Sequence, residues 1–503
     1  MSRTKRFFYN SVTTALYQVV VMLAGFITPR VMLKFYGSEI NGLISSINQF
    51  ILYFNLVEAG LSGAAIYALY KPLADNDYKA INGVITAAKK FYTQSGYIFL
   101  SLTIGLAVIY PLYVKSNVVS PINVSLLVLI LGVNGALEFF TLSKYRVLLT
   151  ADQRTYVISL ASIAHVILNT IIVVVLANLR VNIVVLRLVA LLSIFLRSLI
   201  LMVYVKIRYK FINYKETPNF KALNKRWDAL YLQILGAVHT GAPIIILTIV
   251  TRDLKQVSIY TIYNMVVSGI NGILNIFKSG LSASFGDVIA RGEIKILQKA
   301  YTQFEFAYYS LITIVYSVAF ITIMPFIRIY TAGIKDVNYY IPLTGFLFIL
   351  NGLLYNMKTP QGMLVISAGM YKETKLPTTI QGAIAVIGGA ILTPFLGING
   401  ALIGSILSNF YRDVDLLFFI PKNITKLPVK NTAIRFSRIF LCTFLIWSPF
   451  FFIKLNPTNY ISWIINAIFV GIYALIIVFI NGYIFERAVM LDTFKRIVRM
   501  VGQ

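Results

Sequence analysis

The chain has 503 residues, of which 58% are hydrophobic and 13% are charged, and its formal net charge is +27. Soluble globular domains carry about 25% charged residues, so this composition excludes an ordinary soluble protein. One cysteine and two histidines exclude a disulfide framework and a Cys/His metal site. No nucleophile motif, phosphate loop or paired carboxylate occurs in a polar segment. We therefore expect no catalytic residues, no metal and no enzymatic activity.

Fourteen apolar stretches follow one another, and each is long enough for the about 20 residues that cross a bilayer. Several exceed 25 residues, which predicts tilted helices or helices that continue beyond the membrane. The first follows three basic residues without a small-residue cleavage site, so we expect a first span and not a cleaved signal peptide. The predicted spans lie near 8–35, 40–70, 91–114, 122–149, 156–178, 182–205, 228–250, 259–284, 301–323, 341–367, 377–396, 398–420, 437–453 and 462–485.

The positive charge falls on alternate connections between these spans. Of the 45 Lys and Arg residues, 34 are assigned to one set of loops, ends and adjoining span ends, seven to the opposite set, and four (Arg30, Lys34, Arg187 and Arg197) to the interior of spans. Without Lys144, Arg146, Lys278 and Lys358, which fall within the predicted spans, the balance is still 30 against seven. The positive-inside rule therefore places both termini in the cytoplasm. Basic loops beside anionic lipid headgroups explain the net charge, and nucleic acid is not an expected partner.

The sequence repeats itself. Residues 55–62 (NLVEAGLS) resemble 275–282 (NIFKSGLS) at an offset of 220. Residues 90–94 resemble 299–303, and 195–197 resemble 410–412, in the same order. Because six spans separate the copies, we expect two six-helix lobes of the same orientation, related by a pseudo-two-fold axis along the membrane normal.

The repeat divides the chain into four predicted regions, one of which is the connection between the two lobes. Residues 206–227 combine bases with aromatic residues, which predicts a cytoplasmic interfacial helix, with a solvated linker as the alternative. The predicted organisation is an N-lobe at 1–205, this connection at 206–227, a C-lobe at 228–420, and two additional spans with a cytoplasmic tail at 421–503.

Ionisable residues inside a span usually face a cavity or a partner. Pro29 predicts a bend beside Arg30. Arg30, Lys34 and Arg187 lie nearer the outer surface. For these three, the alternative to a role in a cavity is a long side chain that extends to the lipid headgroups. The excess of bases predicts a cationic cavity for an anionic substrate, formed by Arg30, Lys34, Arg187, Arg197, Lys278 and Lys358.

Acids and histidines also lie inside the spans. Glu58 and Lys278 are equivalent in the repeat, so they either line one cavity between the lobes or form a structural ion pair. His165 is expected to be a hydrogen-bonded core residue. We assign ion pairing or ion coupling to Glu58, Glu138 and His239, with the last also open to a core role.

Several local patterns occur in a characteristic order. They are FITPR at 26–30, GSEING at 37–42, EAGL at 58–61 and GINGA at 397–401. With fourteen spans in two lobes, the whole chain resembles the polysaccharide repeat-unit flippases of the multidrug/oligosaccharidyl-lipid/polysaccharide (MOP) exporter superfamily.

The resemblance implies a substrate and a setting. It implies export of a polyprenyl-pyrophosphate-linked oligosaccharide from the inner to the outer leaflet of the bacterial cytoplasmic membrane by alternating access. It implies a capsule, exopolysaccharide or O-antigen pathway, with a polymerase, glycosyltransferases and membrane lipids as partners. We expect no cofactor; the membrane potential, or a proton or sodium gradient, would supply the energy.

Three alternatives remain. A peptidoglycan lipid-precursor flippase shares the architecture and the charges. A multidrug/toxin extruder shares the fold but exports cations with the help of acids, usually has twelve spans, and fits poorly with Arg30 in a first span that has no carboxylate. A membrane glycosyltransferase or polymerase needs a large outer loop, and the longest, near 324–340, contains one acid, Asp336.

Overall fold

The computed structural model describes residues 3–58, 60–223, 226–278 and 281–501. Every regular element in that part of the chain is a helix. Ten helical segments there are long and apolar enough to cross a membrane, and the first of them, Phe8–Asp75, includes two predicted spans. The predicted spans near 228–250, 341–367 and 398–420 are also helical. These elements confirm an all-α, multi-pass membrane fold with about fourteen spanning helices.

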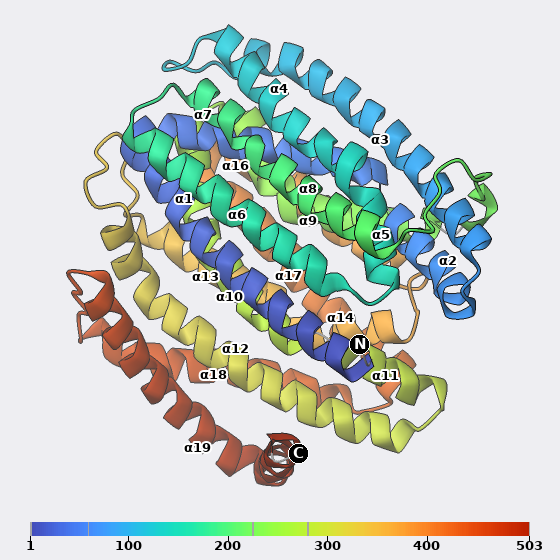
Figure 1. The fold of residues 1–503 in the computed structure, drawn as a ribbon. Helices are drawn as coiled ribbons and strands as arrows, with labels where there is room; N and C mark the ends of the chain where they lie inside the picture. The colour runs from blue at the N-terminus through green and yellow to red at the C-terminus, as the bar shows by residue number, and fades with distance from the viewer. Residues whose placement is uncertain (1–2, 59, 224–225, 279–280, 502–503) are drawn as a thin grey trace. The chain divides into compact units, whose positions relative to one another are not determined.

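By packing, the chain forms two compact units, residues 1–262 and 263–503. In the first unit, α1 packs along α6 and α3 along α4 (Figure 1). Its long buried core includes Leu43, Phe99 and Leu127. Its α-helices are α1 (Arg3–Phe54), α2 (Leu61–Asp75), α3 (Tyr78–Tyr113), α4 (Pro121–Leu137), α5 (Ser143–Ala151), α6 (Thr155–Asn178), α7 (Ile183–Ala190), α8 (Leu192–Arg208) and α9 (Arg226–Thr251). Shorter elements are the 3₁₀ segments Asn55–Glu58 and Phe220–Leu223 and the π-helix Glu138–Leu142.

In the second unit, α12 packs against both α18 and α19 (Figure 1). Helix α10 (Leu254–Lys278) begins within the first unit. The helices that follow are α11 (Leu281–Ala290), α12 (Ile294–Tyr330), α13 (Pro342–Met357), α14 (Thr359–Ser367), α15 (Lys375–Ala383), α16 (Gly389–Leu396), α17 (Ile398–Ile420), α18 (Val429–Trp447) and α19 (Tyr460–Val501). The segments Ile384–Gly388 and Pro421–Thr425 are π-helical, and Ser448–Phe451 is 3₁₀.

Helix α1 contains the boundary between the first two predicted spans. Its backbone stays helical through Pro29 and leaves helical torsion at Gly37, where φ is 83°. Glycine adopts this positive φ without the clash that a Cβ would cause. Further along, a Cβ on Gly42 would lie 1.8 Å from the carbonyl oxygen of Leu254. Two helix backbones therefore approach each other closely at Gly42, as small residues allow in membranes.

Helices are interrupted within predicted spans of both units. The second predicted span breaks at Asn55–Glu58, and Gly60 follows with φ 80°. The fourth span becomes π-helical at Glu138, and the tenth, which is the fourth of the second unit, breaks at Lys358. Each unit therefore has an interruption in its fourth predicted span.

The interfacial helix expected at 206–227 does not form in the described part of that segment. Helix α8 ends at Arg208, and after it only Phe220–Leu223 makes a short 3₁₀ turn. Asn82 explains this, because its side chain donates to the Phe211 carbonyl and accepts from the Asn213 amide, both at 3.0 Å. These bonds hold the backbone in turns and take the place of helical hydrogen bonds.

Candidate functional site

The first unit holds a charged cluster on the π-helix that begins at Glu138. Arg197 on α8 donates through Nη1 to Glu138 Oε1 at 2.7 Å, and its side chain is only 11% exposed. Arg146 on α5 lies 3.6 Å from the other carboxylate oxygen. Insertions of this kind in a helix often mark functional sites. One carboxylate here faces two guanidinium groups, so the cluster keeps a net positive charge.

A second acid lies close to this cluster. The Glu58 carboxyl group lies close enough to Arg146 and Glu138 to interact with their charges. Glu58 also lines a cavity of about 340 Å³ together with Asn55 and Thr240. His165 on α6 lies near Arg197 and Glu138 and contacts the backbone of Ser193. The structure therefore brings Glu58, Glu138 and Arg197 of the predicted set together.

The second unit has a corresponding cluster at Lys358, where α13 gives way to α14. The Lys358 ammonium donates to Asn409 Oδ1 and lies 4.9 Å from the centroid of the Tyr355 ring. Asp413 follows Asn409 by one turn on α17, so both point to the same face. Asp413 is 3% exposed, neither carboxylate oxygen has a hydrogen-bond partner in the described part of the chain, and the charge of Lys358 acts on it.

The two clusters have opposite polarity. In the first unit the fourth predicted span carries the acid, Glu138, and the sixth carries the base, Arg197. In the second unit the equivalent spans carry the base Lys358 and the acid Asp413. Each unit therefore holds an acid and a base between the same two spans, with the signs exchanged.

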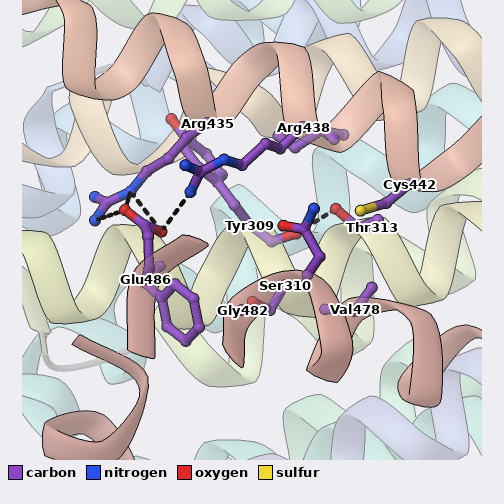
Figure 2. A pocket seen from close by; sticks show the side chains of 12 residues that line it. Tyr309, Ser310, Thr313, Arg435, Arg438, Cys442, Val478, Gly482 and Glu486 are labelled. Atoms are coloured by element: carbon purple, nitrogen blue, oxygen red, sulfur yellow. Dashed lines mark hydrogen bonds and ion pairs between the residues drawn. The ribbon is translucent and has the colours of Figure 1, made fainter. Parts of the chain in front are cut away.

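A third charged cluster joins α12, α18 and α19 within the second unit. Arg435 on α18 lies 2.5 Å from Glu305 and 2.8 Å from Glu486, and Arg438 lies 3.4 Å from Glu486. Figure 2 shows both guanidinium groups turned toward the Glu486 carboxylate. Arg435 is 6% exposed and Glu305 is 1% exposed. Tyr301 and Thr432 also donate to Glu305.

This third cluster lies at a break in α19, because Glu486 has non-helical torsion angles of φ −140° and ψ 40°. Beside it is a cavity of about 40 Å³ that Tyr309, Thr313 and Cys442 help to line (Figure 2). That volume has room for one or two waters. A fully paired, buried network of this kind fixes the two last helices to α12.

The outer bases lie on α1 and α7. Arg187 donates through Nη2 to the sulfur of Met32 at 3.2 Å, and the hydroxyl of Tyr36 lies close enough to interact with its charge. Lys34 is exposed, with its ammonium 5.1 Å from the centroid of the Phe35 ring. Arg30 is half-buried on α1. Participation of these bases in a substrate cavity stays a prediction.

Two predicted site residues lie outside the described side chains. Lys278 ends α10 and His239 lies within α9, but their side chains are not among those that the structure describes. Their roles, and the relation of Lys278 to Glu58, stay predictions.

Sequence reasoning missed Asp413, Glu305 and Arg435. Asp413 belongs to the run RDVD at 412–415, which lies inside the predicted span 398–420. Glu305 lies within the predicted span 301–323. An inventory of every acid inside the predicted spans would have found both, whereas the Arg435 pairing depends on helix packing that the sequence does not display.

Comparisons with protein-family models and with curated protein sequences find no match. Solved structures do match. An inward-facing multidrug resistance MATE family transporter of the MOP superfamily is 13% identical, with a TM-score of 0.66, over 86% of this chain and 99% of that chain. Lipid II flippase MurJ, in an inward closed conformation, is 16% identical, with a TM-score of 0.65, over 96% and 99%. A MATE structure in a bent conformation is 13% identical, with a TM-score of 0.58, over 88% and 97%. The chain therefore has the fold of these transporters and flippases.

Proposed function

We propose that this chain is a flippase that moves polyprenyl-pyrophosphate-linked oligosaccharide repeat units from the inner to the outer leaflet of a bacterial cytoplasmic membrane. The observation that carries the proposal is the extent of the fold match. The lipid II flippase matches 96% of this chain, whereas the two MATE structures match 86% and 88%. The additional matched length favours a relative that exports a lipid-linked substrate.

The last two helices support the same conclusion. Helices α18 and α19 pack on α12 and are fixed there by the buried Arg435 network. Two helices beyond a twelve-helix transporter can line a lateral path in which a polyprenyl chain stays in the lipid. A soluble organic cation needs no such path.

The charge of the first cluster, Arg146, Arg197 and Glu138, fits a pyrophosphate better than a cation. Arg146 and Arg197 outnumber Glu138, and a guanidinium binds phosphate through paired, charge-assisted hydrogen bonds. Since both arginines already neutralise Glu138, Glu58 beside its cavity is the better of the two predicted coupling acids. With the cell interior negative, outward movement of the anion gains about 2.3 kcal/mol per charge per 100 mV.

The test uses purified protein in liposomes and a fluorescent polyprenyl-pyrophosphate oligosaccharide whose outer-leaflet fraction is measured by quenching. Arg197→Ala and Lys358→Ala should each slow transfer at least tenfold. Lys372→Ala, which removes an exposed base outside both clusters, is the matched control. Wild-type rates in both cluster variants would refute a cationic binding site.

A second candidate is a peptidoglycan lipid-precursor flippase, which the match to lipid II flippase MurJ favours. The two candidates share the pyrophosphate and differ in the sugar-linked group. A competition between lipid II and an oligosaccharide repeat unit in the same liposomes separates them. Transport of organic cations without transport of either lipid would instead favour the extruder reading, despite the pairing of Glu138 with two arginines.

A further inference from the structure

A large cavity lies in the second unit where α11, the first turns of α12 and the last turns of α19 meet. Its volume is about 940 Å³, which is at the upper end of the range of about 300–1,000 Å³ for ligand pockets. We propose that this cavity binds one anionic glycerophospholipid of the cytoplasmic leaflet, with the headgroup phosphate at its basic rim and an acyl chain along its apolar wall.

The rim of the cavity is basic. Lys295 and Lys299 come from the start of α12, and Lys495 and Arg496 come from the end of α19. Among the described residues of the lining, the one acid is Asp492, which lies 3.8 Å from Lys299. Four bases and one acid leave a strong net positive charge, which suits a single phosphate diester.

One polar side chain deeper in the wall helps to build the site. Gln303 is buried, and its Oε1 accepts a hydrogen bond from Arg496 Nη1 at 3.0 Å. This bond holds one guanidinium at the rim while its other nitrogens stay available to a phosphate. It also ties the end of α19 to α12, so that the rim contains bases from two helices.

The wall of the cavity is apolar. Phe285, Phe304 and Ala300 line it, and the two phenylalanine rings lie 6.0 Å apart as part of a buried cluster. A free phosphate or a soluble nucleotide would leave this wall in contact with water. A lipid would use both the bases and the wall, which favours an amphiphile as the occupant.

The position in the chain also favours a lipid. The loop before α12 and the segment after Glu486 are both on the side that the alternation of basic loops assigns to the cytoplasm. On that segment Leu491 and Phe494 are exposed, so it can lie at the membrane surface with its apolar side chains toward lipid. Bases at such a surface attract anionic lipid, each contributing about fivefold in affinity.

The test measures lipid retention by full-length purified protein in native mass spectrometry, with phosphatidylglycerol and phosphatidylcholine of equal chain length as probes. One variant replaces Lys295, Lys299 and Lys495 by Gln. A control replaces the exposed residues Lys372, Lys422 and Lys430, with the same change of net charge. A third variant, Ala300→Trp, fills the cavity, and the thermal midpoint without added lipid reports folding.

We expect the wild-type protein and the control to retain phosphatidylglycerol at least tenfold better than phosphatidylcholine. The basic-rim variant should lose this preference, and Ala300→Trp should lose retention of both lipids. Equal preference in the rim variant and the wild-type protein would overturn the proposal, as would an equal loss in the control. Displacement of the lipid by equimolar inorganic phosphate would show a phosphate site without a lipid-binding wall, which also overturns it.

Discussion

Glu138 is the residue on which the first charged cluster depends, because it accepts from Arg197 at 2.7 Å and lies near Arg146. Arg197→Gln should destabilise the protein by about 1–3 kcal/mol, since it leaves Glu138 with only the longer ion pair. Thermal unfolding in detergent measures this. In the double variant with Glu138→Gln, part of the loss should return, and strictly additive losses would mean that the two side chains do not interact.

Glu305 is more buried than Glu138 and accepts more hydrogen bonds, so its substitution should lower stability more. It accepts from Arg435, Tyr301 and Thr432 and is 1% exposed. Glu305→Leu leaves the Arg435 charge with one acid fewer in a buried place, which should cost about 3–5 kcal/mol. Asp287→Leu, at an exposed ion pair with Arg291, is the control and should change stability by less than about 1 kcal/mol. Equal midpoints of unfolding for the two variants would contradict a buried network.

The sequence alone indicates Glu138 and Arg197 as buried charges, because each stands in an apolar stretch. Their pairing is not visible there, since 59 residues separate them and only the packing of α8 against the π-helix joins them. The proximity of Asp413 to Lys358 is likewise not visible in the sequence. Glu138 and Lys358 each lie in the fourth predicted span of their unit, whereas the exchange of charge signs between the units emerges only from contacts.

Helices α1 and α10 approach each other at Gly42, where an added Cβ would lie 1.8 Å from the Leu254 carbonyl oxygen. Gly42→Ala should therefore force the backbones apart and lower stability by about 1–3 kcal/mol. Gly63→Ala on α2 is the matched control, since nothing lies within 4 Å of its Cβ position. Reduced unfolding midpoints for Gly42→Ala alone are expected. A larger loss for the control would refute the close contact.

The ends of α1, α5 and α8 are joined by Asp152, which lies 3.0 Å from Arg6 and accepts from the Tyr209 hydroxyl at 2.6 Å. Burial and the hydrogen bond to Asp152 raise the pKa of Tyr209 above its ordinary value of 10.0. The neutral phenol is therefore favoured in the folded state. Its stabilising contribution is complete below pH 10 and is lost as the pH rises beyond that value.

Unfolding measured from pH 8 to pH 11 checks this. The wild-type protein should lose stability more steeply above pH 10 than Tyr209→Phe, which lacks the titrating hydroxyl. Parallel curves would mean that the Tyr209 hydroxyl does not contribute to the pH dependence of stability.

The contacts of Tyr209 and Asn82 also explain why the segment after α8 is not the interfacial helix that its composition predicts, because they hold its backbone in turns.

For the chain as a whole, hydropathy and the alternation of basic loops are sufficient to predict an all-helical protein with about fourteen spans. These signals are strong because each span must hold about 20 apolar residues and pair its own backbone groups. The sequence predicts the helix breaks at the charged clusters less well than it predicts the spans. Breaks such as the one at Glu138 and the kink at Glu486 follow from local packing, which hydropathy does not record.

The most direct test of the account is voltage-dependent transport in liposomes that contain the wild-type protein. The rate at which a fluorescent polyprenyl-pyrophosphate oligosaccharide reaches the outer leaflet is measured at imposed potentials from 0 to about −100 mV. An anion that crosses with about one uncompensated charge gains about 2.3 kcal/mol over this range, so the rate should rise steeply, by up to about fiftyfold. No transport of this lipid at any potential, with transport of an organic cation in the same vesicles, would contradict the account.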